Sequence, residues 1–135
     1  MKQFLGDDFL LDNEVAKKLY FEHAQKMPIF DYHCHLIPEQ IAEDYHFSSI
    51  TEAWLGKDGY GDHYKWRLRR ELGVEEEYIT GNKSDWEKFE KYTQCMPYRI
   101  GNPIYEWTHL ELKHFFGITK PLCPETAKEI YDECN

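Results

Sequence analysis

The stretch that most constrains the fold is residues 29–38, which read IFDYHCHLIP. It is the one segment that predicts a β-strand, because its side chains alternate between an apolar face and a face with Asp31, His33 and His35. A lone strand cannot pair its own backbone N–H and C=O groups, so it needs partner strands. Either a second copy of the chain supplies them, or the sequence is the front part of a longer protein. We therefore expect a mainly α-helical chain with one strand of a larger sheet.

The two histidines of this stretch are candidate metal ligands. His33 and His35 fall on the same face, so a strand would aim both imidazoles at one point. That arrangement suits a divalent metal such as zinc. Pro38 ends the strand just past the pair. The spacing leaves an alternative open, in which both histidines are exposed at a sheet edge and bind nothing.

Local signals predict helices over most of the remaining chain. SITE (49–52) and SDWE (84–87) are capping-box sequences, and Asn102 followed by a proline is a typical helix start, with Gly117 as the end of that helix. The predicted helices cover about residues 12–26, 38–42, 49–55, 62–72, 84–94, 102–116 and 123–134.

Charge and cysteine content argue against several classes of partner. The formal net charge is −9, so the chain lacks the surplus of Lys and Arg that nucleic acid or an anionic membrane would require. The basic run Lys65–Arg70 is interpreted as a solvated helix face, with a site for an anionic small molecule as the alternative. The four cysteines lack zinc-ribbon or disulfide spacing, and no signal peptide or membrane-spanning run is recognisable. We expect a cytoplasmic protein with reduced thiols.

Aromatic and histidine side chains in two predicted helices are expected to lie in the interior. Trp66, Tyr105 and Trp107 are interpreted as core residues. His109 has apolar neighbours on its helix, so we interpret it as a hydrogen-bonded interior histidine in preference to a catalytic one.

Three motifs together resemble one enzyme family. DYHCHL (31–36), DHYKWR (62–67) and GNPIYEWTHLEL (101–112) occur in this order, and with them the chain resembles the N-terminal part of the uronate isomerase (glucuronate isomerase) family. That family is an outlying member of the amidohydrolase superfamily. The resemblance runs from DDFLL (7–11) to TAKEIYD (126–132), which is nearly the whole chain.

The resemblance implies a fragment of a distorted (β/α)8 barrel of the TIM type. Such barrels need about 250 residues, so this chain would supply only the front portion and its helical insertion. Residues 1–36 would be a lead-in helix and the first barrel strand. Residues 37–117 would form a helical insertion that caps the active site, and residues 118–135 would begin the return to the barrel.

The resemblance also implies a reaction and its residues. The family isomerises hexuronates between aldose and ketose, D-glucuronate to D-fructuronate and D-galacturonate to D-tagaturonate. His33 and His35 would be metal ligands, for zinc in the first place. Tyr64 would move the proton and His63 would bind the uronate. Arg67 is either a ligand of the substrate carboxylate or a structural ion-pair residue.

Two other functions stay open at this point. A hydrolase of the same superfamily would share the histidine pair, and a non-catalytic helical module could self-associate through its strand. Catalytic zinc sites use three protein ligands as a rule, and the resemblance assigns only two to this chain. We therefore expect the 135-residue chain alone to be inactive. The chain could also form a homo-oligomer.

Overall fold

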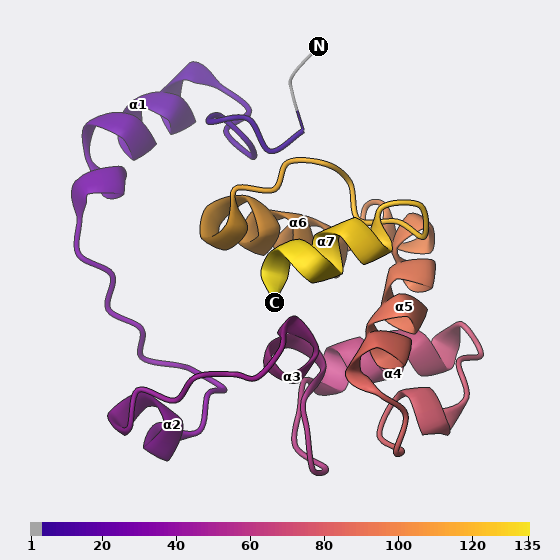
Figure 1. Ribbon diagram of the computed structural model, residues 1–135. Helices are drawn as coiled ribbons and strands as arrows, with labels where there is room; N and C mark the ends of the chain where they lie inside the picture. The colour runs from indigo at the N-terminus through magenta and orange to yellow at the C-terminus, as the bar shows by residue number, and fades with distance from the viewer. Residues whose placement is uncertain (1–3) are drawn as a thin grey trace. The chain divides into compact units, whose positions relative to one another are not determined.

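The computed structural model describes residues 4–135, which are mainly α-helical. It divides the chain into two units, Met1–Tyr45 and His46–Asn135, and each is taken by itself. The first unit contains α1 (Glu14–Glu22), the 3-10 helix η1 (Ala24–Lys26) and α2 (Pro38–Ala42). The second contains α3 (Ile50–Leu55), α4 (His63–Glu71), η2 (Glu76–Tyr78), α5 (Asp85–Cys95), η3 (Met96–Arg99), α6 (Pro103–Phe116) and α7 (Ala127–Cys134) (Figure 1).

The first unit has short helices joined by an extended segment. Asn13 caps α1 by accepting a hydrogen bond from the backbone N–H of Ala16 at 2.9 Å. The predicted helix over 12–26 is interrupted at His23, where the backbone leaves helical geometry before the single turn of η1. Neither α1 nor α2 has a buried residue. This unit therefore has little core of its own.

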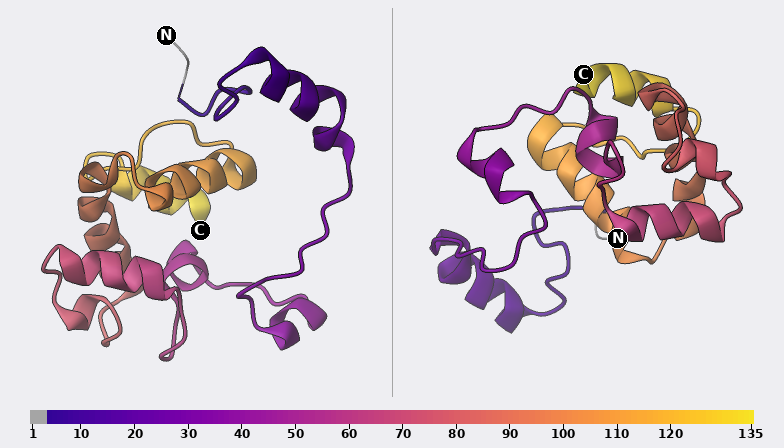
Figure 2. Two further views of the ribbon diagram at one scale, coloured as in Figure 1. Left: turned by 180° about the vertical axis from the view of Figure 1, so that it is seen from behind. Right: turned by 90° about the horizontal axis from the view of Figure 1, so that it is seen from below.

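The expected strand is the main correction to the predicted fold. Residues 29–35 run as an extended trace between η1 and α2 (Figure 2), and residues 4–135 contain no strand, only an isolated bridge between Lys57 and Tyr60. A strand exists through hydrogen bonds to a neighbour, and no neighbour is present in the described part of the chain. The apolar face that the alternation predicted lies open to solvent, with Phe30 86% and Tyr32 89% exposed.

The second unit is organised around α5. This helix contacts α3, α4 and α7, and its Phe89 and Tyr92 side chains are fully buried. Figure 1 shows α5 running away from α4 toward the chain's last helices. The Trp54 ring of α3 stacks on Phe89 with 6.2 Å between ring centroids. Apolar residues from the α-helices, from η3 and from the loop after α6 complete the core: Ile50, Leu55, Leu68, Cys95, Met96, Leu112, Ile118, Leu122 and Ile130.

Helix starts in this unit follow the sequence signals closely. The Ser84 hydroxyl accepts from the Glu87 N–H, and the Glu87 carboxylate accepts from the Ser84 N–H, which completes the predicted capping box. At α3 only half of the predicted box forms, because the Glu52 carboxylate accepts from the Ser48 N–H at 2.8 Å. Helix α7 starts at Ala127, later than predicted, because the residues before it form a turn.

The glycine-rich loop between α3 and α4 is a tight turn whose two ends touch. A Cβ atom on Gly56 would lie 2.0 Å from the Tyr60 carbonyl oxygen, and one on Gly61 would lie 2.5 Å from the Leu55 carbonyl oxygen. Both positions therefore require glycine, and Gly56 also has a φ of +88°. The loop is bridged once more where the Lys57 N–H donates to the Tyr60 carbonyl at 2.9 Å.

The interior assignments are confirmed in part. His109 is buried, and its two ring nitrogens lie 2.6 Å from the Tyr105 carbonyl oxygen and 2.8 Å from the Leu122 N–H. Trp66 is partly buried, with its indole N–H donating to the Leu55 carbonyl at 2.7 Å. The core assignment of Trp107 is wrong for this unit, because its side chain is 55% exposed.

Candidate functional site

The histidine pair lies in the extended segment of the first unit. The Nε2 atoms of His33 and His35 are 2.9 Å apart, so one ring donates a hydrogen bond to the other. In the same segment, the Asp31 carboxylate accepts a hydrogen bond from the His33 backbone N–H at 3.2 Å. Two ligands of a tetrahedral zinc ion lie about 3.3 Å apart when each Zn–N bond is about 2.0–2.1 Å. The two nitrogens thus converge on one point, but at a hydrogen-bond distance that is shorter than the spacing of two zinc ligands.

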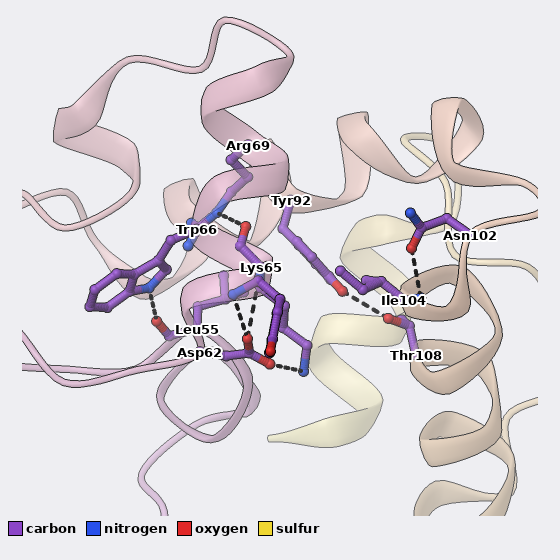
Figure 3. Close-up of polar contacts among 10 residues, drawn as sticks. Leu55, Asp62, Lys65, Trp66, Arg69, Tyr92, Asn102, Ile104 and Thr108 are labelled. Atoms are coloured by element: carbon purple, nitrogen blue, oxygen red, sulfur yellow. Dashed lines mark hydrogen bonds and ion pairs between the residues drawn. The ribbon is translucent and has the colours of Figure 1, made fainter. Parts of the chain in front are cut away.

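Two further predicted site residues, His63 and Tyr64, lie at the first turn of α4. Asp62 caps this helix, because its Oδ1 accepts from the N–H groups of Tyr64 at 2.8 Å and Lys65 at 3.3 Å (Figure 3). His63 and Tyr64 follow the cap directly, and the Tyr64 side chain is 63% exposed. The His63 ring packs edge-on against Trp66, with 5.9 Å between centroids. A polar, exposed pair of side chains therefore begins α4.

Arg67 stands one turn after His63 and already has a protein partner. Its Nε donates to a Glu71 carboxylate oxygen at 2.9 Å, and the same carboxylate accepts from Arg99 at 3.2 Å. The two guanidinium groups hold the pKa of the Glu71 carboxyl below its usual range, with Arg67 as the larger cause. The ion-pair alternative for Arg67 is thus present, while its side chain remains 80% exposed.

The opposite face of α4 is buried and carries two cations. The basic run Lys65–Arg70 was interpreted as a solvated face, and this is wrong for Lys65 and Arg69, which are 8% and 0% exposed. The Arg69 guanidinium donates to the Lys65 carbonyl at 3.4 Å and to the Tyr78 carbonyl at 2.9 Å. Burial lowers the Arg69 pKa to about 10 and also lowers the Lys65 pKa. Two cationic side chains one helical turn apart, Lys65 and Arg69, are thus buried on this face of α4.

A buried hydroxyl pair lies on the same inner side of the unit. The Tyr92 hydroxyl and the Thr108 hydroxyl are 2.8 Å apart, which links α5 to α6 (Figure 3). Burial raises the Tyr92 pKa well above its usual range, so this phenol stays protonated. The Tyr92 side chain is therefore closed off from a substrate, whereas that of Tyr64 is exposed.

The two halves of the predicted site belong to different units. His33 and His35 lie in Met1–Tyr45, and His63, Tyr64 and Arg67 lie in His46–Asn135. Among the described residues, no cluster of three or more His, Cys, Asp or Glu side chains could hold a metal ion. Sequence reasoning missed the roles of Asp62 and Lys65, although an aspartate directly before a helix is a recognisable N-cap signal.

A membrane-spanning helix is absent from residues 4–135, none of whose helices has the length and apolar character required.

Comparison with known proteins places this chain in a family. The family model described as glucuronate isomerase matches residues 1–135. The chain is 62% identical to the uronate isomerase of Bacteroides thetaiotaomicron and 57% identical to that of Clostridium perfringens, and in both cases all of this chain matches 28% of the relative. The crystal structure of uronate isomerase from Thermotoga maritima superposes with a TM-score of 0.87 at 42% identity, over 98% of this chain and 28% of that one.

The superposition shows that this mainly helical chain corresponds to the N-terminal part of a sugar-acid isomerase structure. The chain belongs to the glucuronate isomerase family. It spans about a quarter (28%) of the length of the curated relatives that it matches.

Proposed function

We propose that this chain is the N-terminal portion of a hexuronate isomerase. The reaction would convert D-glucuronate to D-fructuronate and D-galacturonate to D-tagaturonate. The observation that supports it is the 62% identity to the Bacteroides thetaiotaomicron uronate isomerase over the entire chain. The same match favours isomerisation over hydrolysis by another enzyme of the superfamily. A cytoplasmic location and a homo-oligomeric state remain predictions.

The reaction needs a proton to move between neighbouring carbons. The C2 hydrogen leaves as a proton and a proton is returned at C1, while the hydroxyl proton of O2 passes to O1. The C2 alcohol thereby becomes a ketone and the C1 aldehyde becomes an alcohol, with no net oxidation. A base near C2 and a group that holds the carbonyl oxygen are required.

Tyr64 is our candidate for the proton transfer, with His63 as a hydrogen-bond partner of the uronate. Both side chains lie at the exposed start of α4, where a substrate could reach them. Free tyrosine is protonated at neutral pH, so a tyrosinate base requires a positive charge beside it. Arg67, one turn further along the same helix, is a candidate for such a charge and for binding the uronate carboxylate. Its remaining guanidinium N–H groups could bind the substrate while Nε stays with Glu71.

The first unit would supply two metal ligands. His33 and His35 would hold a divalent ion, zinc in the first place, and residues outside this chain would complete the ligand set. Such an ion, when bound, polarises carbonyl and hydroxyl oxygens of a substrate. We further propose that residues 29–36 form the first barrel strand in the longer protein, where neighbouring strands would pair with the backbone.

The test uses a hybrid protein in which residues 1–135 of this chain replace the matching residues of the Bacteroides thetaiotaomicron relative. Proton NMR in D2O, with D-glucuronate or D-galacturonate and zinc, follows the loss of the C2 proton signal and the appearance of ketose. We expect turnover by the hybrid protein and none by the 135-residue chain alone. A folded hybrid protein that yields no ketose from either uronate would refute the proposed function.

The role of Tyr64 is tested in the same hybrid protein. Tyr64→Phe removes the hydroxyl that would carry the proton, and we expect turnover to fall by about 10²–10⁴-fold. Tyr98→Phe is the matched control, because Tyr98 is 74% exposed in the same unit and has no proposed role. Turnover by the Tyr64→Phe protein within about twofold of the control would remove Tyr64 from the mechanism.

A further inference from the structure

The cap of α4 contains an ion pair that a helix cap does not require. Asp62 uses Oδ1 for the N–H groups of Tyr64 and Lys65, and its Oδ2 lies 3.9 Å from the Lys65 ammonium (Figure 3). The Lys65 side chain is only 10% exposed and that of Asp62 is 37% exposed. The side chain of one residue thus binds both the backbone and the side chain of the third residue of the helix.

A lysine at this position is unfavourable on two counts. The N-terminal turn of a helix carries a partial positive charge, which repels a cation. Removal of the ammonium from water costs further free energy, and burial accordingly lowers the Lys65 pKa. The other capped helices of this unit have no cation there, since the third position is Glu52 in α3, Glu87 in α5 and Tyr105 in α6. Capping alone therefore does not explain Lys65.

The surroundings of Lys65 indicate what the cation does. Its ammonium lies 5.4 Å from the ring centroid of Trp54 in α3, and the charge of Glu111 in α6 raises its pKa against the effect of burial. The cation–π contact thus joins the first turn of α4 to α3, and the carboxylate of Glu111 attracts the same ammonium from α6. The Asp62 carboxylate, which pairs with this ammonium, also accepts from the N–H of Tyr64.

We propose that Asp62 and Lys65 are positioning residues, whose ion pair fixes the first turn of α4 so that His63 and Tyr64 face the uronate correctly. This inference rests on the proposed function. A displacement of about 1 Å at a reacting group can cost about 10²-fold in rate, so a rigid first turn matters more for turnover than for folding. The pair acts through Tyr64 and His63 and does not itself contact substrate.

Two variants of the hybrid protein separate positioning from folding. Lys65→Met keeps the length of the side chain and removes its charge, and Asp62→Asn keeps a good N-cap while removing the partner charge. For both we expect kcat to fall about tenfold or more, with KM within about twofold. The melting temperature of Lys65→Met should change little, because the buried ammonium is removed while the partly exposed Asp62 carboxylate keeps its two backbone N–H partners. Lys128→Met is the control, since Lys128 pairs with Asp132 on the exposed side of α7.

A second measurement does not depend on activity. In the 135-residue chain, Lys65→Met should speed hydrogen exchange of the Tyr64 amide about tenfold and leave that of Phe89 unchanged. Unchanged exchange at Tyr64 would overturn the inference even if the hybrid protein is active. Wild-type kcat in both charge variants would overturn it as well. An inactive parent hybrid protein would count against the proposed function, and the exchange experiment would then decide on the positioning role separately.

Discussion

The two units of this chain differ in how much of their structure they stabilise themselves. His46–Asn135 contains the whole core cluster, and several of its side chains are fully buried. In Met1–Tyr45, Leu5 is the one buried apolar side chain among the described residues, while Ile29 is 94% exposed. Burial of apolar surface is the main stabilising contribution in folding. The second unit thus has a core made of its own residues, whereas the described part of the first unit buries almost no apolar side chain.

The largest expected difference between the units is in their response to loss of an aromatic side chain. Phe89→Ala should lower the free energy of unfolding by about 3–5 kcal/mol, because it leaves a cavity at the centre of α5. Phe30→Ala should change it by less than about 0.5 kcal/mol, because Phe30 is 86% exposed. Urea unfolding of the 135-residue chain, followed by circular dichroism, measures both. Similar losses in the two variants would contradict the comparison.

A buried histidine gives the second unit a pH dependence that sharpens the comparison. His109→Phe should cost about 1–3 kcal/mol, because the buried Leu122 N–H loses its partner. His114→Phe, an exposed change on the same helix, is the control.

Burial lowers the pKa of His109 below its ordinary value of 6.5. The stabilisation is therefore complete above pH 6.5 and is lost as pH falls through the lowered folded-state pKa. Below pH 6.5, stability of the wild-type chain should fall more steeply than that of His109→Phe. Parallel curves from pH 7 to 5 would refute this role.

Helix caps provide the smallest expected effect and the most closely matched pair. Ser84→Ala removes half of the capping box of α5, which contacts three other α-helices, so we expect a loss of about 1 kcal/mol in the free energy of unfolding of the second unit. Asn13→Ala removes the cap of α1, which has no buried residue. The free energy of unfolding of the second unit should therefore not change. Hydrogen exchange resolves the two cases. A global loss of protection in Asn13→Ala would mean that the first unit is coupled to the core.

Short-range chemistry explains which parts of the fold were predictable. The starts of α5 and α6 depend on Ser84 and Asn102, which bond to backbone groups two or three residues away, so the sequence itself contains the whole interaction. The alternation over 29–36 predicts a strand, but a strand forms only with hydrogen-bonding partners, and residues 4–135 supply none. The burial of Lys65 and Arg69 was not predictable from the sequence. In a basic run, the sequence does not distinguish a cation that packs against other helices from a solvated one.

For the candidate site, the sequence supplies the candidate residues and the structure supplies their surroundings. The motifs identified His33, His35, His63 and Tyr64 by resemblance, and the structure adds the 2.9 Å approach of the two histidines and the exposed start of α4. The engagement of Arg67 with Glu71 was one of two sequence alternatives. How these groups meet a uronate remains a prediction.

The closed turn between α3 and α4 offers a practical attachment point. Gly56 and Gly61 are in backbone contact at the base of this turn. The end of α3 and the start of α4 are therefore held together independently of what is attached at the tip of the turn. A dye or an inserted epitope at Asp58 or Gly59 would therefore leave both helices in register. Such a reporter would lie a few residues before Asp62. It would therefore respond to a rearrangement of the first turn of α4.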